Sequence, residues 1–272
     1  MAVSEGDARV LASFAAAKEA YPELGPLLNF YEAIHRTQFE AKAVLSDREV
    51  EIAPEPLRRE RLEKGEIQLT FEQFHLDRPV FSRLVREMSY IILENSPGWK
   101  VPSEPVEMAV LTDMARRWFE SGEPVAGNGP PTTLVALAVG FALSTYLQRA
   151  AEQLHTLLDR EQWRRKVCPV CGGKPGFATL ARADGSRSLF CPRCHDVWPF
   201  RRTACPFCEN EEGVVYYPSE DGVYRLYVCP KCRRYLKTKD LRRTDSELIL
   251  PLERVITVDL DLTAQEEGYL YC

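Results

Sequence analysis

Eight of the nine cysteines in this chain stand in four pairs that share one spacing, Cys-x-x-Cys. The pairs follow one another between residues 168 and 232, and they are Cys168/Cys171, Cys191/Cys194, Cys205/Cys208 and Cys229/Cys232. Regular pairs of this kind are typical of tetrahedral metal sites, in which two such turns supply four thiolates to one ion. Disulfide scaffolds are usually short and secreted, and a thioredoxin-type dithiol belongs to a strand–helix unit that does not surround these cysteines. All eight are therefore predicted metal ligands, whereas Cys272, the last residue, stands alone.

The cysteine-bearing segment repeats itself. The two pairs of each copy are separated by 19 and 20 residues, and the second copy follows the first at an offset of 37 to 38 residues. Each copy has an Asp-Gly step, Asp184-Gly185 or Asp221-Gly222, between two short β-prone runs, which predicts a hairpin between two cysteine turns. The repetition favours joining the first pair with the second and the third with the fourth. A cross-braced site, which joins the first pair with the third, is the alternative.

The thiolate sets predict two metal ions, with iron favoured and zinc as the alternative, because four-thiolate sites of this shape take either metal. All four pairs begin Cys-Pro, and the first reads CPVCGG, which is similar to the cysteine turns of rubredoxins. Two isolated ions fit the hairpin spacing better than an iron–sulfur cluster does. A module of about 35 residues has too small a core to fold without its ion, so the expected role of the metal is structural. His195, directly after Cys194, is expected to be solvated and not to bind metal.

Residues 1–165 have the pattern of a helical domain. Apolar residues recur every three or four positions along residues 24–45 and 79–95, and further helices are expected at residues 7–20 and from a cap at Ser103 to Gly122. A long helix that Thr132 or Thr133 caps, and that extends toward Arg164, is apolar nearly all round in its first half, which predicts a central buried helix. Residues 48–77 fit either a loop or a partly helical connection.

No membrane insertion and a cytoplasmic location are expected. The longest nearly apolar run, residues 134–147, is 14 residues long, whereas a helix that crosses a membrane needs about 20. The first ten residues have no basic flank leading into an apolar stretch, so they do not resemble a secretory signal.

The predicted fold class is α+β, with an N-terminal helical bundle followed by two tandem rubredoxin-like or zinc-ribbon modules. The predicted parts are a helical domain at residues 1–165, a first four-cysteine module at 166–203, a second at 204–240 and a C-terminal segment at 241–272. In that last segment, residues 254–262 alternate in a way that predicts a strand, and residues 263–267 a helical turn.

The stretch CPRCHDVWPFRRTACPFC resembles the formate dehydrogenase accessory protein family (FdhE). In that family a Cys-x-x-Cys pair is followed by an acidic residue and a Trp, then by an Arg and the next pair. The matching residues here are Asp196, Trp198 and Arg201 or Arg202. The tail sequences YLKTKDLR and VITVDLDLTAQEEGY are also similar, so the likeness is specific over most of residues 165–270 and general over the helical half.

The resemblance implies a cytoplasmic assembly factor that binds the molybdenum- or tungsten-containing catalytic subunit of formate dehydrogenase and carries iron-associated rubredoxin-like modules. Asp196, Trp198, Arg201 and Arg202 are then candidate partner-binding residues. A non-enzyme is also expected from the sequence itself, which has no GxSxG, Walker, GxGxxG or HExxH motif. Whether the chain forms a homodimer is left open.

Two other functions compete with this one. Residues 163–243 hold 17 Lys and Arg against 8 Asp and Glu, which suggests a zinc-ribbon protein that binds nucleic acid. Two tetrathiolate sites reduce that local charge of +9 to about +5, and the ribbons lack a dense basic stripe with interleaved aromatic residues, so no nucleic-acid partner is expected. The second alternative is a rubredoxin-like electron-transfer protein.

Overall fold

The computed structural model describes residues 3–45, 50–76, 78–96, 99, 106–124 and 130–271. The chain divides into two compact units. One comprises Met1–Ile52 and Leu69–Gln153 and is helical; the other comprises Ala53–Gln68 and Leu154–Cys272 and is built on a sheet. The helices and the two four-cysteine clusters give the expected α+β class with two zinc-ribbon-like modules. The finer boundaries at residues 165, 203 and 240 stay predictions.

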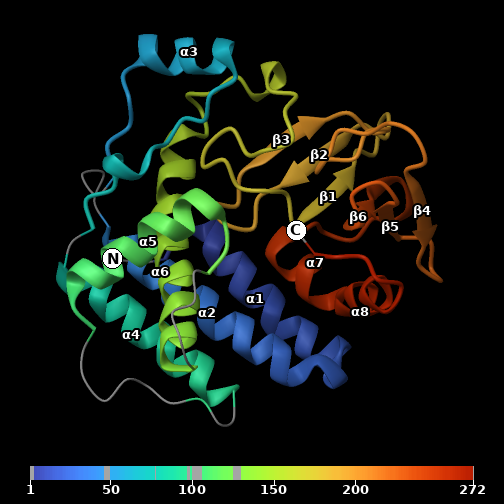
Figure 1. The fold of residues 1–272 in the computed structure, drawn as a ribbon. Coiled ribbons are helices and arrows are strands. Elements are labelled where there is room, and N and C mark those ends of the chain that lie inside the picture. Colours follow the sequence, from blue (N-terminus) through green and yellow to red (C-terminus); the bar gives the residue numbers. More distant parts are fainter. Residues whose placement is uncertain are drawn as a thin grey trace. The chain divides into compact units, whose positions relative to one another are not determined.

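The helical unit consists of five α-helices and two short 3-10 turns within the described residues (Figure 1). They are α1 (Glu5–Ala20), η1 (Pro22–Leu24), α2 (Gly25–Val44), η2 (Phe71–Gln73), α4 (Arg78–Glu94), α5 (Met108–Ser121) and α6 (Pro130–Leu154). The predicted cap at Ser103 lies outside the described residues. Glu107 has an extended backbone, so α5 begins at Met108, later than the expected start at residue 104.

Helix α6 is the central helix of this unit. Ala138, Val139, Ala142 and Leu143 are all fully buried, as the apolar pattern predicted. Within the described residues, Thr133–Leu154 is the one segment that is long and apolar enough to cross a membrane. Of its most apolar stretch of 18 residues, 83% is buried inside the fold. Such burial is what a core helix shows.

Both ends of α6 differ from the expectation. The helix begins at Pro130, so Thr132 and Thr133 lie inside it and do not cap it; proline fits the first turn because an N–H there has no partner within the helix. The helix ends at Leu154, ten residues before Arg164. The chain beyond it turns, through η3 (Arg160–Gln162), and Trp163 Nε1 donates a hydrogen bond to Val167 O at 2.7 Å.

The second unit contains a six-stranded sheet in the order β3-β2-β1-β6-β5-β4. The strands are β1 (Phe177–Leu180), β2 (Arg187–Phe190), β3 (Val197–Phe200), β4 (Val215–Pro218), β5 (Tyr224–Cys229) and β6 (Arg234–Asp240). Each module supplies three antiparallel strands, and the two modules join where β1 runs parallel to β6. The hairpins β1–β2 and β4–β5 follow the prediction, whereas the third strand of each module, β3 or β6, was not predicted.

Both edges of the sheet carry a proline, Pro199 in β3 and Pro218 in β4. Proline cannot donate a hydrogen bond to a further strand, so it suits an edge. The two edges differ in cover, because β3 alternates between buried and half-buried residues while all four residues of β4 are exposed.

The strand predicted at residues 254–262 is wrong, because α7 (Leu250–Ile256) and α8 (Val258–Glu266) occupy this segment. Figure 1 shows both helices beside β5 and β6. Lys237 on β6 donates to Arg254 O at 2.8 Å and to Thr257 O at 3.1 Å, which satisfies carbonyl groups at the end of α7. Ala264 of α8 packs in a buried cluster with Leu226, Val228 and Tyr235 of the sheet. These tertiary contacts outweigh the local β-propensity.

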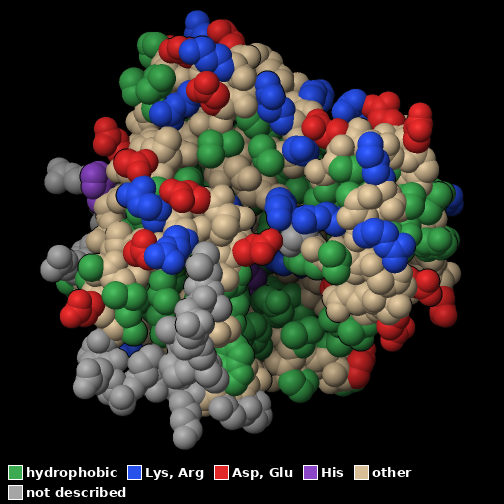
Figure 2. Space-filling model, viewed as in Figure 1, with side chains coloured by type: hydrophobic (Ala, Val, Ile, Leu, Met, Phe, Trp, Pro, Cys, Tyr) green, Lys and Arg blue, Asp and Glu red, His purple; other side chains and the backbone are tan. Residues whose placement is uncertain are grey.

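The segment that the sequence left undecided contains a short helix, α3 (Glu55–Lys64). This helix has no buried residue and is stabilised by ion pairs one turn apart, Glu55–Arg59 and Glu60–Lys64. Figure 2 shows its acidic and basic side chains interspersed. The chain after α3 returns to the first cysteine turn, where Gln68 N donates to Pro169 O at 2.9 Å.

Candidate metal centres

The eight paired cysteines form two four-sulfur clusters. Cluster 1 contains Cys168, Cys171, Cys191 and Cys194, and cluster 2 contains Cys205, Cys208, Cys229 and Cys232; within each, all four sulfurs lie within 4.8 Å of one another. The structure thus groups the first pair with the second and the third with the fourth, as the repeat favoured. The cross-braced alternative does not occur, because the first and third pairs lie in different clusters.

The sulfur–sulfur distances suit one tetrahedral ion in each cluster. In cluster 1, Sγ of Cys168 lies 3.5 Å from that of Cys194, and Sγ of Cys171 lies 3.5 Å from that of Cys191. In cluster 2, the corresponding distances are 3.6 Å for Cys205–Cys232 and 3.7 Å for Cys208–Cys229. A metal–sulfur distance of about 2.3 Å in tetrahedral geometry separates two sulfurs by about 3.8 Å. Both clusters could therefore hold a metal ion with small adjustments, and thiolate donors fit zinc and iron alike.

All four cysteine turns have the same backbone. The residue after the second cysteine of each pair is left-handed, with φ of 70° at Gly172, 63° at His195, 59° at Glu209 and 55° at Arg233. The N–H of that residue donates to the carbonyl oxygen of the first cysteine at 2.8–3.0 Å in every turn. This shared geometry aims both sulfurs of a pair at one point, and three of the four turns hold it with a residue that is not glycine.

His195 adopts this strained conformation and does not belong to either four-sulfur cluster. Its ring centroid lies 5.4 Å from that of Phe190, and the residue is half-buried. The expectation that it is not a ligand agrees with this placement, although it is less solvated than expected.

Cluster 1 is enclosed by residues of its own unit. Oδ2 of Asp196 lies 3.9 Å from Cys168 Sγ, and the other carboxylate oxygen accepts a hydrogen bond from Arg160 Nε at 2.8 Å. Burial raises the pKa of Asp196, and the Arg160 guanidinium opposes that shift. A Cβ on Gly173 would come 2.9 Å from Cys191 Sγ, so only glycine allows the backbone to approach this sulfur so closely.

Cluster 2 is more accessible. Cys205 and Cys229 are buried, but Cys208 and Cys232 are half-buried. The backbone N–H of Phe207 donates to Cys205 Sγ at 3.5 Å, an interaction that favours the thiolate over the thiol. The same four-cysteine plan therefore produces one closed and one half-open site.

The thiols within each cluster compete for ionisation. In cluster 1, burial raises the pKa of Cys168 and Cys194 well above the usual value. The pKa of Cys171 lies well below it, because hydrogen bonds from the other three thiols outweigh burial. Four thiolates so close together repel one another, and a divalent cation removes that repulsion, so metal binding releases protons from these sites.

The four candidate partner-binding residues are in different surroundings. Trp198 is fully buried and its Nε1 donates to Arg165 O at 2.9 Å, and Asp196 is buried beside cluster 1. Arg201 and Arg202 are exposed; Arg201 pairs with Glu211 and Glu209, whereas Arg202 forms no ion pair with a described residue. Their role in binding a partner stays a prediction. Sequence reasoning missed Arg160, since no motif marks a residue that only encloses a site, and it quoted Gly173 within CPVCGG without assigning it a role.

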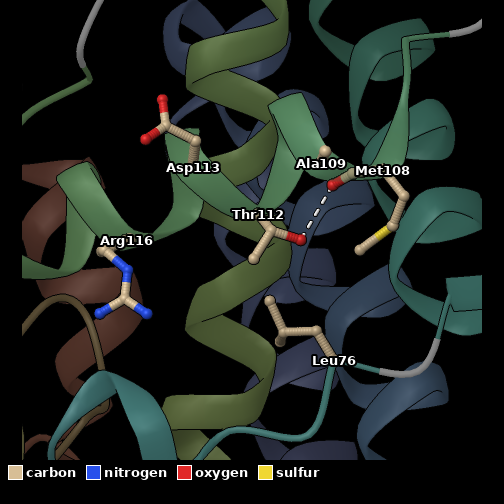
Figure 3. A pocket seen from close by; sticks show the side chains of 6 residues that line it. All are labelled: Leu76, Met108, Ala109, Thr112, Asp113 and Arg116. Atoms are coloured by element: carbon tan, nitrogen blue, oxygen red, sulfur yellow. Dashed lines mark hydrogen bonds between the residues drawn. The ribbon is translucent and has the colours of Figure 1, made fainter.

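The helical unit has a shallow hollow of about 440 Å³. Figure 3 shows its lining, in which Thr112 Oγ1 donates to Met108 O at 2.9 Å and Arg116 points away from the methionine. Arg116 pairs with Glu72. The lining residues are Leu76, Met108, Ala109, Thr112, Asp113 and Arg116. They include no set of convergent ligands, so the clusters are the better candidate site.

Comparison with models of protein families gives no match. Two curated relatives, both called "Protein FdhE homolog", align with nearly the whole chain. The one from Aquifex aeolicus (strain VF5) is 27% identical over 267 residues, which cover 93% of this chain and 88% of the relative. The one from Rhizobium meliloti (strain 1021) is 25% identical over 261 residues, which cover 90% and 81%.

A solved structure shares the fold. The crystal structure of the FdhE protein from Pseudomonas aeruginosa matches 99% of this chain and 94% of that one, with a TM-score of 0.67 and 22% sequence identity. The two curated relatives support the FdhE family, and the solved structure shows that the fold is shared.

Proposed function

We propose that this chain, which the comparisons support as a member of the FdhE family, is a cytoplasmic accessory protein that binds the catalytic subunit of formate dehydrogenase during its maturation. The observation that carries the proposal is the extent of the likeness. Curated FdhE homologues align with at least 90% of the chain, so both the helical unit and the metal modules take part in the match.

The proposal assigns the two clusters a structural role. Each cluster fixes two cysteine turns and the hairpin between them, and the two modules then share one sheet through β1 and β6. When bound, a metal ion supplies the cross-link that a module of about 35 residues needs in order to fold. Iron is the favoured ion and zinc the alternative, and no enzymatic step is assigned to the chain.

Complementation tests this function. The gene is expressed in a bacterium whose own FdhE gene has been deleted, and formate dehydrogenase activity is measured along with the amount of the catalytic subunit. We expect activity to return without a change in the amount of the subunit's messenger RNA, and we expect the tagged chain to capture the immature subunit. Formate dehydrogenase activity that does not return when the chain is expressed, or capture of an unrelated subunit as efficiently as of the immature catalytic subunit, would contradict the proposal.

One-electron transfer is a second candidate, which the half-open cluster 2 favours. A tetrathiolate iron site changes between ferrous and ferric states, whereas zinc does not. This candidate predicts a reversible redox change in the bound metal. A zinc-loaded, redox-silent chain that still restores formate dehydrogenase would eliminate it.

A further inference from the structure

One face of the sheet collects arginines around a single carboxylate. Leu180 on β1 pairs with both Arg187 on β2 and Asp240 on β6, so these two side chains share a face. Arg225 lies on the same face, opposite Thr238 on β6. The Asp240 carboxylate is fully buried and receives both Arg225 and Arg242.

The opposite face of the same strand is balanced. There Lys237 pairs with Asp261 of α8, and Lys239 pairs with Glu253 of α7. Each of these lysines therefore has a carboxylate of its own. On the arginine face, Asp240 is shared by two arginines, and neither Arg187 nor Arg202 pairs with a carboxylate of the described chain.

Arg187 is buried without enough hydrogen-bond acceptors. Its side chain is among the largest that are fully buried, and its guanidinium lies 4.4 Å from the centre of the Tyr227 ring. Nη1 donates to Ala204 O at 3.0 Å, but Nε and Nη2 have no hydrogen-bond partner among the residues that the structure describes. Burial lowers the pKa of Arg187; Tyr227 and Cys205 oppose that shift, and the like charge of Arg202 adds to it. Such a group is unusual, because buried donors are nearly always satisfied.

A glycine allows two arginines to lie against the backbone of the β1–β2 turn. Gly185, at the β1–β2 turn, has φ of 69°, and a Cβ there would lie 2.7 Å from Arg242 Nη1 and 3.2 Å from Arg202 Nη1. Both nitrogens thus approach one point. Arg242 is held by two hydrogen bonds of 2.8 Å from its Nε and Nη2 to Asp240, which leaves Nη1 for another acceptor.

The other acid at this turn is already engaged. Asp184 accepts a hydrogen bond from the Ser186 N–H at 2.9 Å, which holds the pKa of that carboxyl below its usual value. It is exposed and does not form an ion pair with Arg202 or Arg242. Among the described residues, no carboxylate therefore pairs with Arg202, and Arg242 pairs with Asp240.

We propose that Arg202 and Arg242 bind the phosphate group of a small molecule over Gly185, and that the buried charge of Arg187 strengthens this site. An oxyanion that bridges the two Nη1 atoms would accept charge-assisted hydrogen bonds from both, each about 2.8 Å long. A phosphate monoester carries up to two negative charges and three acceptor oxygens, which suits several converging guanidiniums better than a carboxylate with one charge does.

Isothermal titration of the metal-loaded, full-length chain tests the site. Inorganic phosphate and pyrophosphate are titrated at one ionic strength, set with sodium chloride. We expect saturable binding to one site, and we expect Arg202→Ala to weaken it by at least about tenfold. Arg201→Ala is the matched control, because its side chain is adjacent and also exposed but already paired with Glu211; it should change the affinity less than about twofold.

The proposal would be overturned if phosphate showed no saturable binding, or if the two variants lost equal phosphate affinity. It would also be overturned if acetate bound as tightly as phosphate. The fourth such result is a single-stranded oligonucleotide that binds more tightly than pyrophosphate, with a steep salt dependence. The last result would identify a nucleic acid as the source of the phosphate. None of these readouts involves formate dehydrogenase, so the site and the proposed function can fail separately.

Discussion

Clusters 1 and 2 have the same ligands and nearly the same spacing, yet their surroundings differ. All four cysteines of cluster 1 are buried, whereas Cys208 and Cys232 of cluster 2 are half-buried. Cluster 1 is enclosed by Asp196 and its partner Arg160, and Arg160 lies before the repeat begins. A repeated motif therefore fixes where the sulfurs lie, and the chain outside the repeat decides how accessible they are.

The largest expected effect comes from removing one ligand of the closed cluster. Cys171→Ser removes a buried thiolate from cluster 1, and Cys208→Ser removes a half-buried one from cluster 2. Structural zinc binding contributes about 10–16 kcal/mol in small metal-dependent domains. We expect Cys171→Ser to abolish cooperative unfolding of the sheet unit, and Cys208→Ser to unfold only the second module while the first module stays folded with its ion. Metal analysis and near-ultraviolet circular dichroism measure the metal content and the folded structure of each variant. Equal loss of metal and of structure in the two variants would contradict the distinction between the clusters.

The next effect concerns the strand that joins the modules. Hydrogen bonding from Arg242 lowers the pKa of Asp240 to about 2, from 3.8. A carboxyl whose pKa is lower in the folded than in the unfolded state stabilises the fold at any pH above its unfolded pKa. This stabilisation by Asp240 disappears as the pH falls from about 4 to about 2. We expect Asp240→Asn to lower the free energy of unfolding by about 2 kcal/mol at pH 7. Urea unfolding measures the change.

Asp245→Asn is the control for that variant, because the Asp245 side chain is 99% exposed and pairs with Arg182 at the surface. It should change the free energy of unfolding by less than about 0.5 kcal/mol. Similar losses in the two variants, or a loss in Asp240→Asn that does not shrink at low pH, would contradict the assigned role of Asp240.

Metal release should separate the clusters kinetically. A chromophoric chelator reaches Cys208 and Cys232 more easily than the buried sulfurs of cluster 1. We expect two phases, with one ion leaving at least about tenfold faster, which corresponds to about 1.4 kcal/mol in the barrier. The fast phase should be absent in Cys208→Ser, and a single phase for two ions in the unmodified chain would show that the clusters are equally protected.

The smallest effect lies in the cysteine turns themselves. Gly172 and Glu209 occupy the same left-handed position in clusters 1 and 2. Replacing Glu209 with Gly should stabilise the fold by about 0.5–1 kcal/mol, since left-handed backbone is unfavourable for other residues. Gly172→Ala should destabilise it by about 1 kcal/mol or more, because its Cβ would also lie 3.2 Å from Ile67 Cδ1. Thermal melting gives the sign of the stability change in each variant. Melting temperatures that shift in the same direction in both variants would contradict a shared left-handed geometry at these two positions.

Sequence spacing predicted the cysteine groups and the first two strands of each module, because Cys-x-x-Cys and Asp-Gly are local signals. It did not predict β3 and β6, and it assigned a strand to residues 254–262, where the end of α7 and most of α8 lie; only the helical turn at residues 263–267 agrees with α8. These strands and helices depend on contacts between distant residues, such as the bond from Lys239 to Glu253. The role of Arg160 was missed for the same reason, since a residue that covers a site carries no motif, and the role of Gly173 depends on its closeness to Cys191 in the next cysteine turn.

X-ray absorption at the metal edge tests most directly whether the two clusters are separate metal sites. The sample is anaerobically purified chain whose metal content has been measured. If they are separate, we expect about two ions per chain, each with four sulfur neighbours at about 2.3 Å and no second metal nearby. A short metal–metal distance, oxygen or nitrogen in the first coordination sphere, or one ion per chain would contradict it.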